Sequence, residues 1–255
     1  MFETLHFIWL GLCFAVIVGG AIYAKYKKFS LTTALTVLCA CAIASELVKI
    51  FCVLIENQRV NEYGVFIKET DLPFHLCSMQ IIFAFVARLT KNNKTRECVV
   101  QFMIPTAALG GFAALMIPTI TCRFTNVRTY QYFLYHAALI WFAVVAIMSG
   151  EVKLDFKAFR NTLVILLGLV WVTFYINGMF QNTNFLYLSE PPMDGLPILN
   201  MDNGWLVYFL SYMALALTLI ALFFVPFWIR NAKQRRCCGN CKSCQTETTE
   251  QPQEN

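Results

Sequence analysis

One cysteine in this sequence lies beside a proline and a histidine, at the point where an apolar segment begins. Residues 71–78 read Asp-Leu-Pro-Phe-His-Leu-Cys-Ser. Pro73 suits the first turn of a helix, so Cys77 is expected near a helix N-terminus, which favours a thiolate. A thiolate with an imidazole in reach is the nucleophile–base pair of cysteine acyl-transfer enzymes. Alternatively, Cys77 is one more buried thiol in a chain with eleven cysteines.

Two of the three histidines are candidate partners for this thiol. His136 is the candidate base, because it lies about 9 Å from the outer end of its apolar segment and Cys77 lies about 7 Å from the end of its own. His75 is two residues from Cys77, so the two cannot point the same way from a regular helix. It could still orient the thiol or a lipid head group. Gln80, at i+3, is expected to share the face of Cys77.

Glu46 and Lys49 lie inside another apolar segment. Their i, i+3 spacing puts them on one helix face, where they can form an ion pair. Ionisable residues are costly inside a membrane and are therefore candidates for function. The pair could simply fix helix packing. Alternatively, one of its members could line a polar cavity, meeting a substrate head group or orienting a histidine.

The candidate polar residues share one depth. Glu46, Lys49, Cys77, His136 and Asn177 lie about 5 to 13 Å from the outer ends of four apolar segments. Unrelated polar residues would be scattered over both leaflets. The common depth therefore predicts a single polar site in the outer half of a membrane.

The segments that position these residues are predicted membrane-spanning helices. The chain of 255 residues is 58% hydrophobic and 14% charged, whereas soluble domains are about 25% charged. Its apolar runs are close to the ~20 residues that cross the hydrocarbon core. We therefore expect an all-α, polytopic transmembrane helix bundle with a retained first span. The seven predicted spans are residues 6–24, 31–55, 72–89, 98–120, 130–149, 161–180 and 204–229.

The basic residues predict the orientation. Fifteen of the twenty lysines and arginines fall on one side of this arrangement and four on the other, with Lys49 inside a span. The positive-inside rule makes the richer side cytoplasmic. The N-terminus is then outside and the C-terminus in the cytoplasm, as an odd number of spans requires. We expect a multi-pass protein of the plasma membrane.

The chain is expected to divide into a membrane domain, residues 1–229, and a cytoplasmic tail, residues 230–255. The tail is basic, then rich in cysteine, then polar, and its end is expected to be disordered. Cys237–Cys244 has CxxCxxC spacing, but metal or iron–sulfur binding needs a defined scaffold. Lipidation is an alternative, and a reduced, loosely ordered tail is the simplest interpretation. No metal or cofactor is predicted.

Two further segments allow alternative interpretations. The fourth span holds Pro105, Gly110-Gly111 and Pro118, which could break the helix beside a ligand or allow close packing of helices through small residues. The long outer loop 181–203, which includes Asn184, could cap a site or could be a solvated connector.

Several of these motifs resemble a known family. The stretch from Asp71 to Ser78 is similar to the LPxHLCS signature of the YwaF-like bacterial integral membrane proteins, a group that includes the eukaryotic transmembrane protein 164. Glu46-Leu47-Val48-Lys49, Gly110-Gly111, Tyr135-His136 and residues 182–187 match in order. The resemblance covers roughly residues 40–212.

The eukaryotic member of that family is regarded as a cysteine-dependent phospholipid acyltransferase. The resemblance implies that Cys77 accepts an acyl chain and that His136 is its base. The sequence departs from the family at Ala137, where relatives often have a second histidine. It departs again at Asn203-Gly204-Trp205-Leu206, where a GPWP pattern is usual. These departures weaken the inference that the chain has the family's activity more than the inference that it has the family's fold.

Two functions remain open from the sequence. In the first, the protein is an acyltransferase or lipid hydrolase: Cys77 attacks a phospholipid ester, and the acyl group passes to a lysophospholipid or to water. Gln80 or Asn177 supplies an oxyanion donor and Lys49 meets the phosphate. In the second, it is a transporter or ligand sensor with a polar Glu46/Lys49/His136 site. The expected partners are membrane lipids and not nucleic acid, and the oligomeric state is left open.

Overall fold

The computed structural model describes residues 4–59, 69–180, 182–193 and 199–239, and every regular element in them is helical. The expected all-α class is therefore confirmed. The elements are α1 (Thr4–Tyr26), α2 (Leu31–Arg59), η1 (Glu69–Asp71), α3 (Leu76–Leu89), α4 (Asn93–Met116), α5 (Val127–Ser149), α6 (Phe156–Met179), η2 (Phe185–Tyr187) and α7 (Trp205–Gly239).

Within these residues, six helices are long and apolar enough to cross a membrane: α1, α2, α4, α5, α6 and α7. The helix α3 has 14 residues and is about 21 Å long, which is shorter than the ~30 Å hydrocarbon core. The expectation that the third helical segment begins at residue 72 is wrong. His75 has φ −72° and ψ 148°, an extended conformation, so the helix begins at Leu76 and Pro73 lies before it.

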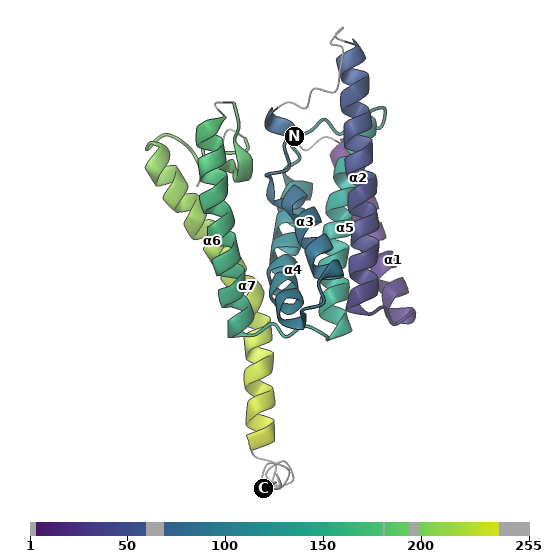
Figure 1. Cartoon of the computed structure of the whole chain (residues 1–255), viewed down its shortest axis with the longest axis vertical. Helices are drawn as coiled ribbons and strands as arrows, with labels where there is room; N and C mark the ends of the chain where they lie inside the picture. Colours follow the sequence, from purple (N-terminus) through teal and green to yellow (C-terminus); the bar gives the residue numbers. More distant parts are fainter. Residues whose placement is uncertain (1–3, 60–68, 181, 194–198, 240–255) are drawn as a thin grey trace.

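Successive long helices run in opposite directions (Figure 1). The α1–α2, α3–α4 and α5–α6 connections lie at the end of the bundle from which the last turns of α7 project. We call this the lower end, and the opposite end the upper end. The short helix η1, the start of α5 and η2 lie toward the upper end, so the elements expected to carry a site start from the same side of the bundle.

The core lies around α4 and α5. In the most apolar 18 residues of each helix, the buried fraction is 61% for α4 and 56% for α5. The corresponding fraction is 11–28% for the other four candidate spans. The peripheral helices expose large apolar side chains, such as Leu47 at 61%, Trp171 at 79% and Leu222 at 59%. Such faces are stable in lipid rather than in water.

The helix α4 is continuous through Pro105 and Gly110-Gly111. The interpretation of a broken helix is therefore wrong, and Pro118 lies beyond the helix end. A Cβ atom at Gly111 would be 2.9 Å from Cγ1 of Ile140 and 3.1 Å from the carbonyl oxygen of His136. The glycine thus allows α4 and α5 to pack closely.

The last helix extends further than expected. α7 continues to Gly239, past the boundary placed after residue 229, and includes Pro226. Residues 240–255 lie outside the described part of the chain, and so do the side chains of 235–239. The expected disorder of the tail end and the cysteine cluster fall on these residues.

Candidate functional site

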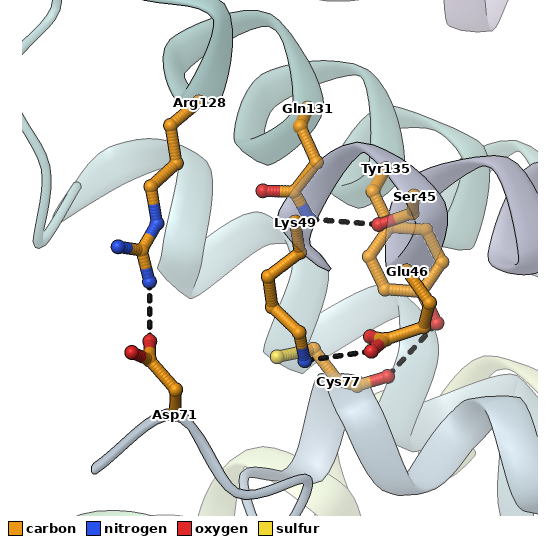
Figure 2. A network of polar contacts seen from close by, with 8 residues as sticks. All are labelled: Ser45, Glu46, Lys49, Asp71, Cys77, Arg128, Gln131 and Tyr135. Carbon is orange, nitrogen blue, oxygen red and sulfur yellow. Dashed lines mark hydrogen bonds and ion pairs between the residues drawn. The ribbon is translucent and has the colours of Figure 1, made fainter. Parts of the chain in front are cut away.

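Cys77 is the second residue of α3 and is half-buried. The Tyr135 hydroxyl of α5 donates a hydrogen bond of 2.9 Å to the Cys77 carbonyl oxygen. This bond, drawn in Figure 2, joins the start of α3 to the middle helix of the core. The backbone of Cys77 is therefore held by a tyrosine that the sequence places directly before His136.

The expected ion pair between Glu46 and Lys49 is present. Lys49 Nζ lies 2.7 Å from Glu46 Oε2, and the two side chains are 16% and 30% exposed, respectively. In the view of Figure 2 the Lys49 ammonium overlaps Cys77, and the two residues interact electrostatically. Lys49 also interacts with His75. One cation of α2 thus faces both the thiol and the nearest histidine in sequence.

Two further polar contacts fix the helices around this group. Gln131 Nε2 donates to Ser45 Oγ at 2.7 Å and joins α5 to α2. Arg128 pairs with Asp71, which joins α5 to η1 just before the Leu-Pro-Phe-His stretch (Figure 2). Tyr135, Gln131 and Arg128 were not predicted to be part of the site, although all three lie within the eight residues before His136.

The loop after α6 packs over the start of α3. The His75 ring lies 5.2 Å from that of Phe185 and 5.5 Å from that of Tyr187, between ring centroids. Leu186 and Tyr187 have φ of 55° and 54°, a left-handed conformation that costs non-glycine residues on the order of 1 kcal/mol or more each. Burial raises the pKa of the Tyr187 hydroxyl. The loop is folded into place, as a cap would be.

Asn177 and Asn184 hold this loop in shape. Asn177 Nδ2 donates to the Phe185 carbonyl oxygen at 3.0 Å, and its Oδ1 accepts from the Phe185 amide at 2.9 Å. Asn184 Oδ1 accepts from the Ser189 amide at 3.0 Å, and its Nδ2 donates to the Glu190 carbonyl oxygen at 2.8 Å. Both amide groups are occupied by the loop backbone.

Gln80 faces α4. Its Nε2 donates to Thr106 Oγ1 at 2.7 Å, and the side chain is 1% exposed. Gln80 therefore lies in the interface between α3 and α4. A buried amide bonded in this way stabilises the α3–α4 contact.

His136 is buried at 4% exposure. Its Nδ1 lies 2.7 Å from the Tyr132 carbonyl oxygen, and its ring centroid is 4.3 Å from that of Tyr132. In the described part of the chain, no hydrogen bond joins the Cys77 thiol to either His75 or His136. The structure therefore brings together Cys77, Glu46, Lys49 and His75. The contacts of His136 described above are instead with Tyr132 on its own helix.

Among the described residues, no three His, Cys, Asp or Glu side chains are grouped so that they could bind a metal ion. The arrangement instead provides one thiol, one cation and imidazoles, next to apolar helix faces.

Six long apolar helices among the described residues, of which α4 and α5 form the buried core, define a polytopic α-helical membrane protein. More narrowly, the chain belongs to the TMEM164 family, whose model matches residues 1–224. The resemblance to transmembrane protein 164 is thereby confirmed, and the likeness to YwaF-like bacterial proteins stays a prediction. No curated protein and no solved structure matches the chain.

Proposed function

We propose that this protein is a membrane-embedded acyltransferase or lipid hydrolase that uses Cys77 to take an acyl chain from a phospholipid. The observation that carries the proposal is the position of the thiol at the start of α3, within electrostatic range of the Lys49 ammonium. A helix N-terminus and a cation both favour a thiolate, whereas burial opposes ionisation. The ammonium can also bind the phosphate of the substrate.

The proposed reaction has two steps. His136 accepts the thiol proton while sulfur attacks the ester carbonyl, and the lysolipid oxygen leaves with that proton. The thioester is then attacked by the hydroxyl of a lysophospholipid or by water, which restores the thiol. If Nδ1 of His136 carries the proton and donates to Tyr132, Nε2 is the free base nitrogen. His75 is proposed to orient the head group.

The other substrate-binding expectations are supported unequally. Glu46 is proposed to orient Lys49 through their ion pair. An oxyanion role for Gln80 or Asn177 has less support, because their amides are already hydrogen-bonded. Asn184 is proposed to act by shaping the loop.

We propose that α3 completes a set of seven membrane spans. The N-terminus is then outside the cell and the C-terminus in the cytoplasm, and the protein lies in the plasma membrane. The alternation of helix directions in Figure 1 and the fifteen-to-four division of basic residues support this topology. The substrate then enters from the outer leaflet, between lipid-facing helices.

The test is acyl transfer from a fluorescent phospholipid by the purified chain. Cys77→Ala is expected to abolish transfer, and Cys41→Ala, in the apolar segment of α2, is expected to leave it unchanged. Mass spectrometry should find a hydroxylamine-sensitive acyl adduct on Cys77. Full transfer by Cys77→Ala would exclude the proposal and favour a transporter or sensor built on Glu46, Lys49 and His136, for which the thiol is unnecessary.

A further inference from the structure

Two arginines meet α2 at the lower end of the bundle, far from Cys77. Arg88 comes from the last turn of α3, and its Nε donates to Thr36 Oγ1 at 2.8 Å. Arg96 comes from the first turns of α4, and its Nη2 donates to Thr32 Oγ1 at 2.6 Å. The two threonines are one helical turn apart, so both guanidinium groups lie along one face of α2.

Neither arginine forms an ion pair with an acidic residue in the described part of the chain. Among the described residues, the ion pairs are Glu46–Lys49 and Asp71–Arg128. The Nε atom of Arg96 is buried without any hydrogen-bond partner in that part of the chain. A guanidinium has five N–H donors, so beyond the two bonds to threonine most donors of this pair have no partner among the described residues. Two uncompensated guanidinium groups side by side match the geometry and charge of a phosphate.

An apolar track leads away from this pair. On α2, Thr36 is followed at i+4, i+7 and i+11 by Ala40, Ile43 and Leu47, which are all exposed on the same face. Ile43 is 49% exposed and Leu47 61%. A polar head and a long apolar strip in line have the shape of a phospholipid.

The neighbouring helix adds a second apolar surface. α3 packs against α2 and exposes Ile82, Val86 and Leu89 at 57%, 40% and 71%. These three residues are spaced i, i+4, i+7 and so share one face. Acyl chains beside the arginine pair would therefore have apolar contacts on both helices.

We propose that Arg88 and Arg96 bind the phosphate of an anionic phospholipid in the leaflet at the lower end, with an acyl chain along α2. Basic groups between spanning helices on the cytoplasmic side are a known means of binding acidic lipid head groups. This site is independent of the Cys77 chemistry and holds a lipid without reacting with it.

The test compares two double variants that remove the same charge. Arg88→Gln/Arg96→Gln removes the proposed site, and Lys91→Gln/Lys94→Gln removes two nearby exposed lysines. The full chain in micelles is mixed with phosphatidylglycerol or phosphatidylcholine, and bound lipid is counted by native mass spectrometry. The wild type and the lysine variant should retain phosphatidylglycerol, and the arginine variant should bind it about tenfold more weakly.

Inorganic phosphate at equal ionic strength separates a lipid from a free anion. It should not raise the Tm of the wild type, whereas phosphatidylglycerol should. Stabilisation by phosphate equal to that by the lipid overturns the proposal, as does equal retention of phosphatidylcholine or wild-type binding by the arginine variant. If the double variant fails to fold, Arg88→Gln alone, at an exposed position, must still weaken phosphatidylglycerol binding.

Discussion

At the scale of single residues, Lys49 has contacts that serve two different roles. Its ion pair with Glu46 stabilises α2, and its position beside Cys77 and His75 suits recognition of a phosphate. Measuring the stability and the activity of matched variants can separate the two roles. A structural ion pair can be replaced if both charges are removed together, whereas binding of a phosphate needs the ammonium group of Lys49.

We expect Lys49→Met and Glu46→Gln each to lower the free energy of unfolding by about 1–3 kcal/mol, since each leaves a partly buried charge without its partner. The double variant should regain most of the loss. If Lys49 binds phosphate, the double variant should still transfer little acyl group. Thermal unfolding measures the loss of stability, and the fluorescent transfer assay measures the loss of activity. A fully active double variant would mean that the Glu46–Lys49 pair has only a structural role.

Tyr135 provides a second residue-scale test. Tyr135→Phe removes the hydrogen bond to the Cys77 carbonyl oxygen and should destabilise the protein by about 0.5–1.5 kcal/mol, the usual net contribution of one hydrogen bond. Tyr23→Phe, at an exposed position of α1, is the control. The rate at which iodoacetamide labels Cys77 should change in Tyr135→Phe and not in Tyr23→Phe. Identical labelling rates in the two variants would argue against a role of Tyr135 in positioning Cys77.

At the scale of elements, apolar run length and charge spacing predicted most of what was found. Six long helices and the Glu46–Lys49 pair follow from local patterns that the sequence carries directly. The start of α3, the Tyr135 bond and the folding of the outer loop by Asn177 were not predicted. These depend on contacts between segments far apart in the chain, which hydropathy and spacing do not encode.

The α4–α5 contact gives a prediction at this scale. Gly111→Ala should destabilise the protein by about 1–3 kcal/mol, because the new methyl group would lie 2.9 Å from Ile140 and close to a backbone oxygen. Gly168→Ala, where nothing lies within 4 Å, should have little effect or stabilise slightly. Equal Tm values for the two variants would contradict the close packing.

At the scale of the whole molecule, the orientation can be tested directly. In a cysteine-free background, a single cysteine at position 93 should resist an impermeant reagent applied outside intact cells, and one at position 190 should react. The connection before α4 carries Lys91 and lies at the lower end (Figure 1). Labelling of position 93 from outside would reverse the topology.

If α3 completes the set of spans as proposed, its length has a consequence for the surrounding bilayer. The helix would fall about 9 Å short of the ~30 Å hydrocarbon core, so the backbone of residues 72–75 would lie where lipid otherwise surrounds a spanning helix. Exposed backbone is not tolerated there unless protein covers it or water reaches it, and η2 covers part of it. Hydrophobic mismatch of this kind thins the adjacent leaflet. Longer-chain lipids oppose such thinning, so access to Cys77 should decrease as the host membrane thickens, and the protein would be sensitive to the chain length of its own surroundings.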